Sequence, residues 1–103
     1  MQIYVYMLRC SDDSYYVGLT RAGLDKRIGE HQAGRFRKCH THKRRPVRLV
    51  WSQHFLSLRD AIACERQLKG WRREKKEALI AGNFLALQEL ARSKAPRPST
   101  GSG

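Results

Sequence analysis

The first part of the chain carries runs of β-branched and aromatic residues that are typical of β-strands. Residues 3–8 and 15–19 are rich in β-branched and aromatic side chains, and the turn formers of residues 11–14 separate them. Two such runs joined by a short polar loop predict a β-hairpin. A third run, residues 47–51, alternates only partly but also predicts a strand.

Helical periodicity follows the hairpin and fills the second half of the chain. Apolar positions recur at helical spacing within residues 24–31, and Gly34 is suited to end that helix. Ser57 begins a second helix like a capping box, with Asp60 in place of the preferred Glu. Gly70 interrupts this helix before a basic helix over 71–80 and a last amphipathic stretch.

These elements predict an α/β protein of the α+β type, with a short three-stranded antiparallel sheet flanked by helices. A chain of 103 residues has room for one domain. We place that domain at residues 1–92. Residues 93–103 are rich in Pro, Ser, Thr and Gly, have nothing to bury, and are predicted to form a disordered tail.

The charge balance favours a polyanionic partner. Twenty-one Lys and Arg against nine Asp and Glu give a net charge of +12. Such a field on a small domain suits DNA, RNA or an anionic membrane surface, and nucleic acid is the preferred partner. The sequence has no apolar run of about 18 residues, so a membrane-spanning helix is not expected.

The cysteines and the N-terminal residues indicate the cellular compartment of the protein. Cys10, Cys39 and Cys64 are odd in number and form no C-x-x-C pair, so they predict reduced thiols. The first nine residues lack the basic start and small-residue cleavage site of a signal peptide. A cytoplasmic location follows as the expectation.

Two basic segments are candidate nucleic-acid contacts. The residues that we select are Lys69, Trp71, Arg72, Arg73 and Lys76 around the basic helix, and Arg44 and Arg45 in the loop of residues 35–46. Basic side chains neutralise phosphates, and a Trp stacks on unpaired bases, although packing into the core is the commoner role for Trp. The loop is equally well interpreted as a contact surface or as a solvated segment.

Five elements occur together in the order of a known nuclease family. They are Val5-Tyr6, Tyr16-Val17-Gly18, the helical pair Arg27 and His31, and Glu65 on a later helix. This set resembles the GIY-YIG nucleases, above all their small stand-alone bacterial members, over about Tyr4 to Ile80. The first motif lacks its glycine, and the late asparagine of larger relatives has no counterpart here, so leaving-group stabilisation is unassigned.

The resemblance implies a catalytic set of Tyr6, Tyr16, Arg27, His31 and Glu65. Glu65 would be the ligand of one Mg²⁺ or Mn²⁺, since these cations prefer oxygen ligands and retain waters. Arg27 would bind two phosphate oxygens. A free tyrosine titrates near pH 10, too high for a base at neutral pH.

The remaining roles in this set follow from charge and space. The cation and Arg27 are expected to favour a phenolate, with either tyrosine as the base and Tyr16 preferred. His31 would orient a tyrosine or relay a proton. Gly18 would let phosphate or backbone approach closely.

The sequence therefore predicts a metal-dependent endonuclease that hydrolyses DNA phosphodiester bonds. The resemblance favours single-stranded or structured DNA, and RNA stays an alternative. A non-catalytic nucleic-acid-binding domain on the same scaffold is the main competing hypothesis, followed by a basic protein of the ribosome or membrane surface. The sequence does not choose among repair of DNA, recombination and uptake, and it gives no oligomeric state.

Overall fold

The computed structural model describes residues 2–94, with side chains described through residue 89. Three strands, β1 (Ile3–Arg9), β2 (Tyr15–Thr20) and β3 (Arg48–Phe55), form an antiparallel sheet in the order β2-β1-β3. The predicted fold class, hairpin and third strand are confirmed. The third strand extends to Phe55, beyond the predicted end at Trp51, because its polar residues pair with β1 along the half-exposed edge of the sheet.

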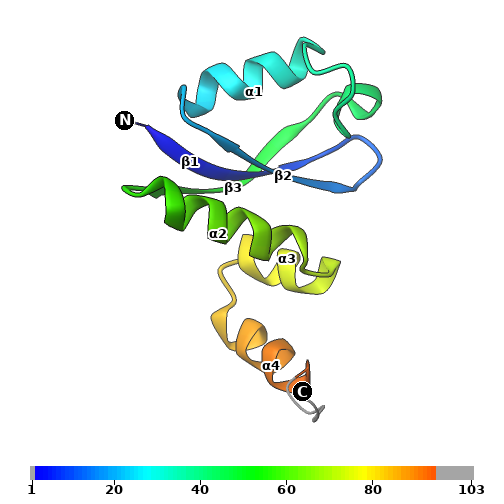
Figure 1. Ribbon diagram of the computed structural model, residues 1–103. Coiled ribbons are helices and arrows are strands. Elements are labelled where there is room, and N and C mark those ends of the chain that lie inside the picture. The colour runs from blue at the N-terminus through cyan, green and yellow to red at the C-terminus, as the bar shows by residue number, and fades with distance from the viewer. Residues whose placement is uncertain (1, 95–103) are drawn as a thin grey trace. The chain divides into compact units, whose positions relative to one another are not determined.

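The central strand β1 is buried on both faces. Helix α1 (Leu24–Gln32) lies on one face and α2 (Leu58–Lys69) on the other (Figure 1). On the α1 face, a core cluster is formed by Tyr6, Leu8, Cys10 and Val47, with Tyr16, Leu24 and Ile28 packed against it. On the other face, α2 contributes the buried Ala61 and Leu68. The apolar periodicity of both helices therefore serves one sheet.

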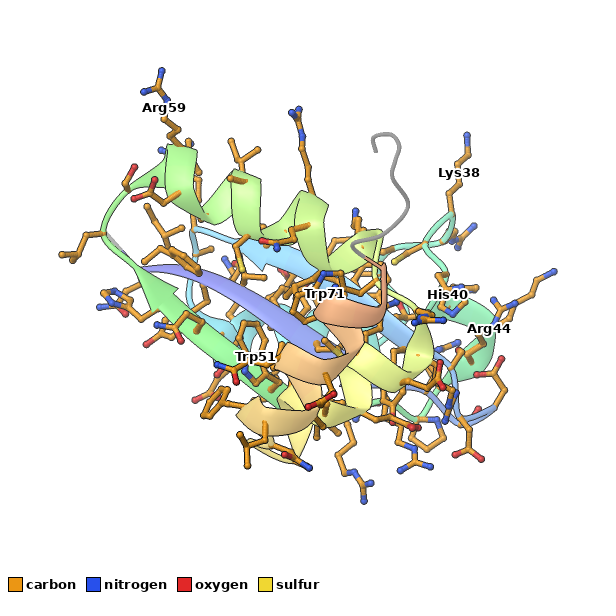
Figure 2. All side chains as sticks on the ribbon, turned by 90° about the horizontal axis from the view of Figure 1, so that it is seen from below. Lys38, His40, Arg44, Trp51, Arg59 and Trp71 are labelled. Carbon is orange, nitrogen blue, oxygen red and sulfur yellow. The ribbon has the colours of Figure 1, made fainter. Side chains whose placement is uncertain are left out.

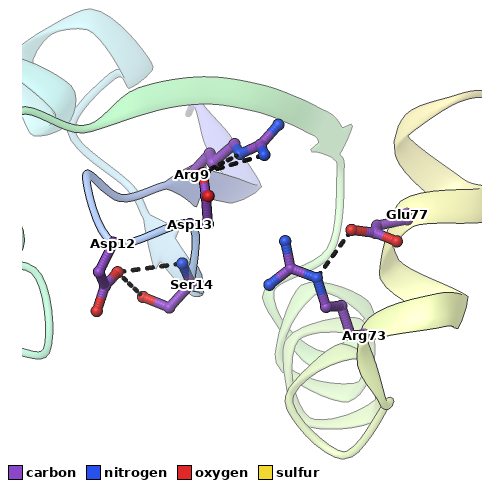
Figure 3. A network of polar contacts seen from close by, with 6 residues as sticks. All are labelled: Arg9, Asp12, Asp13, Ser14, Arg73 and Glu77. Carbon is purple, nitrogen blue, oxygen red and sulfur yellow. Dashed lines mark hydrogen bonds and ion pairs between the residues drawn. The ribbon is translucent and has the colours of Figure 1, made fainter.

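The turn between β1 and β2 fixes the pairing of the hairpin. Cys10 N–H donates to Ser14 O at 2.8 Å, and Asp13 adopts φ 67°, a left-handed conformation that Asp tolerates better than most residues. Asp12 Oδ1 accepts from both the N–H and the hydroxyl of Ser14 (Figure 3). The resulting register sets Tyr6 opposite Gly18 and Leu8 opposite Tyr16.

The long basic loop is folded against this turn. It contains a short 3-10 helix, η1 (His42–Arg44). Arg44 Nε lies 2.8 Å from Asp12 Oδ2, Ser11 N–H donates to Arg44 O at 2.8 Å, and Ser14 Oγ lies 2.8 Å from His40 Nε2. The loop is therefore attached to the hairpin at several points, which local sequence alone did not indicate.

The described chain divides into two compact units at Gly70, the residue predicted to interrupt the helices. In the first unit, the Ser57 hydroxyl caps α2 by accepting from Asp60 N–H at 3.4 Å, as predicted. The second unit contains α3 (Arg73–Ile80) and α4 (Phe84–Lys94). Helix α4 includes the first two residues of the predicted tail, and the rest of that tail lies outside the described residues.

Candidate active site

Two motif tyrosines meet on the α1 face of the sheet. Directly paired residues of antiparallel strands point to the same face, so Tyr6, opposite Gly18, and Tyr16, opposite Leu8, are diagonal neighbours. Their ring centroids lie 6.3 Å apart. Tyr6 is 1% exposed, whereas Tyr16 is half-buried. The arrangement gives Tyr16 the better access to solvent.

Gly18 makes room for the side chain of a tyrosine. A Cβ at this position would lie 2.5 Å from both Cζ and Oη of Tyr6, and 2.9 Å from the Tyr16 ring. Those contacts are far below van der Waals separation, so only glycine fits beneath the phenol. The Tyr6 side chain thus fills the space that the missing Cβ of Gly18 leaves open, and a phosphate contact at Gly18 stays a prediction.

His31 lies between the two tyrosines. Its Nε2 is 2.8 Å from Tyr6 Oη and its Nδ1 is 2.9 Å from Thr41 Oγ1, and the side chain is 2% exposed. The ring packs at 5.2 Å, edge to face, against Tyr16. Burial first, and then the nearby charge of Arg27, lower the pKa of His31, so the imidazole is neutral at pH 7.

Arg27 completes this group from α1, one turn before His31. Its guanidinium lies over the Phe36 ring at 5.2 Å, and its positive charge acts against the raised pKa of Tyr6. Arg27 Nε is buried and lies 3.4 Å from Glu30 Oε1, yet among the described residues it has no hydrogen-bond partner of good geometry. That Nε–H is therefore a buried donor beside the Glu30 carboxylate.

Burial controls the protonation of both tyrosines. It raises the pKa of Tyr6 to about 12, against the smaller opposing effect of Arg27. Burial, followed by a hydrogen bond with Cys39, raises the pKa of Tyr16 as well. The expectation that the surrounding charges favour a phenolate is wrong for the protein alone, since both phenols remain protonated at neutral pH.

Glu65 lies on α2 with its side chain 19% exposed and forms an ion pair with Lys69 at 2.7 Å. Its charge contributes to the raised pKa of Tyr16, so the carboxylate lies within electrostatic reach of that phenol. Within the described part of the chain, no group of three or more His, Cys, Asp and Glu side chains could enclose a metal ion. A lone carboxylate still fits Mg²⁺ or Mn²⁺, because these ions take their remaining ligands from phosphate and water.

Several residues near the tyrosines carry no signal in the sequence. Thr41 contacts His31, Phe36 packs on His31 at 4.8 Å, and the exposed His40 ring stacks on Tyr16 at 6.5 Å. Cys39 Sγ accepts from Thr41 Oγ1 at 3.5 Å. All four belong to the basic loop, and no spacing rule links such a loop to a sheet face.

The two loop arginines selected as nucleic-acid contacts hold the loop together. Arg44 donates to His40 O and pairs with Asp12, and Figure 2 shows Arg44 beside His40 while Lys38 extends away. Arg45 donates to His42 O at 2.8 Å and to Gln32 O at 3.3 Å. Their guanidinium groups are thus largely engaged within the protein.

The basic residues around the second unit do not form the single helical stripe that the sequence suggests. Lys69 ends α2 and pairs with Glu65, whereas Trp71 and Arg72 precede α3. Arg73 pairs with Glu77 at 2.9 Å (Figure 3), and burial lowers the pKa of Lys76. The Trp71 ring lies under Lys75 Nζ at 4.8 Å. Trp71 therefore packs against its own unit.

Comparison with known proteins decides the family. The GIY-YIG catalytic domain matches residues 2–78 of the chain. The chain belongs to the GIY-YIG family. Membership places it in a nuclease superfamily and indicates a nucleic-acid substrate, and such nucleases generally use divalent metals. Among the described residues, no helix is long and apolar enough to cross a membrane.

Relatives of this GIY-YIG protein carry the name UPF0213, which states no activity. One from Streptococcus pneumoniae is 38% identical over 80 residues, covering 78% of this chain and 79% of the relative. One from Natronomonas pharaonis is 41% identical over 78 residues, covering 76% and 89% respectively. A solution NMR structure of a UPF0213 protein from Bacillus halodurans is 32% identical, with a TM-score of 0.52, and covers 96% of this chain and 100% of that chain.

Proposed function

We propose that this protein is a metal-dependent endonuclease that hydrolyses DNA phosphodiester bonds. The observation that carries the proposal is the convergence of Tyr6, Tyr16, His31 and Arg27 on one sheet face, with the Glu65 carboxylate in electrostatic reach. Phosphodiester hydrolysis needs a positioned water and stabilisation of charge on the phosphate, and these groups suit both tasks.

In this mechanism Tyr16 contacts the attacking water, because it is more exposed than Tyr6. Its phenol is protonated at neutral pH, so its oxygen orients the water through its lone pairs. The Arg27 guanidinium, whose side chain is 30% exposed, would bind phosphate oxygens and keeps its charge throughout. Glu65 would hold one Mg²⁺ or Mn²⁺, whose charge would lower the pKa of bound water and stabilise charge on the phosphate.

The Glu65–Lys69 ion pair supports the competing function, a nucleic-acid-binding domain without catalysis. Lys69 Nζ lies 2.7 Å from Glu65 Oε2, the carboxylate that a metal ion would need as its ligand. The Lys69 side chain is however 53% exposed, and exposed ion pairs contribute only about 0–1 kcal/mol, so a divalent cation should displace it. Catalysis therefore remains the function that we propose.

Single-stranded or structured DNA is the proposed substrate, with RNA as the alternative. The positive net charge of +12 suits any nucleic acid, and no element of the described chain is an evident reader of base edges. The three free cysteines suit a reducing compartment, in agreement with a proposed cytoplasmic location.

The experiment combines labelled single- and double-stranded DNA and RNA with Mg²⁺, Mn²⁺ or EDTA. We expect metal-dependent cleavage that falls at least about 100-fold in Glu65→Gln, while binding is retained. Glu74→Gln is the matched control, because Glu74 also pairs with a basic neighbour, Arg72, at 3.8 Å. Binding of every substrate without cleavage under any metal would establish the non-catalytic alternative.

A further inference from the structure

A chain of buried polar side chains runs from the loop to the sheet. Tyr6 Oη lies 2.8 Å from His31 Nε2, His31 Nδ1 lies 2.9 Å from Thr41 Oγ1, and Thr41 Oγ1 lies 3.5 Å from Cys39 Sγ. Tyr6, His31 and Thr41 are each at most 2% exposed. Solvent therefore has little access to replace any partner in this chain.

The direction of each hydrogen bond follows from the donors available. Thr41 Oγ1 donates its single proton to Cys39 Sγ, so it accepts from the Nδ1–H of His31. A neutral imidazole has only one N–H, which leaves Nε2 as an acceptor. The Tyr6 hydroxyl must then donate to His31, and its oxygen lone pairs face elsewhere.

The charge of Arg27 lowers the pKa of Tyr6 against the effect of burial, and its guanidinium lies over Phe36, which packs on His31. With the opposite tautomer, His31 Nε2–H would donate to Tyr6, and the phenolic proton would have to turn away from His31. It would then approach the guanidinium, which has donors only. The tautomer of His31 therefore determines whether the lone pairs or the proton of the Tyr6 hydroxyl turn toward the Arg27 charge.

We propose that Thr41 is a positioning residue that fixes the Nδ1–H tautomer of His31 and, through Tyr6, aligns the Arg27 guanidinium with the phosphate. The activity measurement below rests on the proposed nuclease function, whereas the two spectroscopic measurements do not. Thr41 touches neither substrate nor metal in this assignment and acts only through the hydrogen-bond chain.

Thr41→Val removes the hydroxyl and keeps nearly the same shape, and Thr41→Ser restores the hydroxyl. Thr20→Val is the matched control, because Thr20 is also 1% exposed and its Oγ1 accepts from Ala22 N–H at 3.1 Å, outside the chain of contacts. Long-range ¹H–¹⁵N correlation spectra report the His31 tautomer directly. The Arg27 Nε–H signal and its exchange with solvent report the alignment of the guanidinium.

We expect wild type, Thr41→Ser and Thr20→Val to hold the Nδ1–H tautomer and a slowly exchanging Arg27 Nε–H. Thr41→Val should populate both tautomers and expose the Arg27 signal. Its turnover at saturating substrate should fall by about 10- to 100-fold, since a small misplacement of a phosphate-binding group has effects of that size. Thr41→Ser should recover to within about three-fold of wild type.

The proposal is overturned if wild type shows the Nε2–H tautomer, or if Thr41→Val changes neither the tautomer nor the Arg27 signal. It is also overturned if those signals change in Thr41→Val while turnover of a cleaving wild type does not. Absence of cleavage in wild type would refute the proposed nuclease instead, and the two spectra would still decide the tautomer and the alignment. Thermal unfolding of each variant identifies a loss of fold.

Discussion

The buried phenol of Tyr6 links the stability of the fold to alkaline pH. Its pKa is raised from 10.0 to about 12 by burial, so the unfolded chain loses this proton more readily than the folded one. The stabilising contribution is complete below pH 10 and is lost as the pH rises through about 12. A shift of this size corresponds to about 2–3 kcal/mol at most.

We therefore expect the free energy of unfolding of wild type to fall between pH 10 and 12 more steeply than that of Tyr6→Phe. Chemical denaturation at a series of pH values measures the difference. Equal slopes for the two proteins would mean that folding does not raise the pKa of Tyr6, and that its phenol is accessible to solvent in the folded protein.

Gly18 allows a test of the close packing beneath the Tyr6 ring. Gly18→Ala places a Cβ against the Tyr6 ring, so we expect destabilisation of about 1–3 kcal/mol and a loss of cleavage larger than the loss of binding. Gly29→Ala on α1 is the control, because a Cβ there meets nothing within 4 Å and alanine favours a helix. Denaturation and cleavage assays separate the two, and a Gly18→Ala protein as stable as wild type would contradict the close packing.

Single-residue chemistry was the part least accessible from the sequence. The motif spacing selected Tyr6, Tyr16, Arg27 and His31, and the fold brings these four to one sheet face. It could not show that burial outweighs the charge of Arg27 at Tyr6 or that burial raises the pKa of Tyr16, because burial depends on the whole packed face. Nor could it select Thr41, which is ten positions from His31 and follows no motif.

Of the segments in the fold, the basic loop depends most on contacts with residues far from it in the sequence. Hydrogen bonds from Ser14 first, and then Arg44, lower the pKa of Asp12 to about 2. The Asp12–Arg44 pair is therefore complete above about pH 4 and is lost as the pH falls toward 2. At neutral pH it attaches the loop to the β1–β2 turn.

Asp12→Ala should release this attachment. We expect faster backbone hydrogen exchange over residues 38–45 and reduced cleavage, while α2, on the opposite face of the sheet, keeps its exchange rates. Asp25→Ala, at an exposed carboxylate in the first turn of α1, is the control. Unchanged exchange in the loop would show that the remaining contacts hold it without Asp12.

Elements with strong local signals were predicted well. The hairpin, α1 and the Ser57 cap depend on spacing and turn residues within a short window, and all three are present. The end of β3 was missed, since its polar residues owe their strand conformation to pairing with β1. The attachment of the loop was missed for the same reason, as its partners lie far along the chain.

At the scale of the whole molecule, the net charge of +12 predicts binding that weakens steeply with salt. Lys38 and Arg59 project from different parts of the first unit (Figure 2), and only Lys38 belongs to the loop beside the tyrosines. For single-stranded DNA, Lys38→Gln should make the slope of log K against log salt shallower by about 0.7, the loss of one phosphate contact.

Arg59→Gln removes the same amount of charge and should leave that slope unchanged. Fluorescence titrations over a range of salt concentrations measure both. If the two variants weaken binding equally, the protein attracts nucleic acid through its net charge alone, and the loop has no special part in contacting it.

The diagonal placement of Tyr6 and Tyr16 across the hairpin makes the length of a five-residue segment, Cys10 to Ser14, decisive for the proposed catalytic centre. Side chains alternate between faces along a strand, so a slip of β2 by one position against β1 would carry Tyr16 to the α2 face and leave Tyr6 without its neighbour. Insertions or deletions in this turn are therefore tolerable only when they keep Tyr16 on the same face of the sheet as Tyr6. The tip of an exposed loop, ordinarily the most permissive place in a protein, is here as constrained as the core.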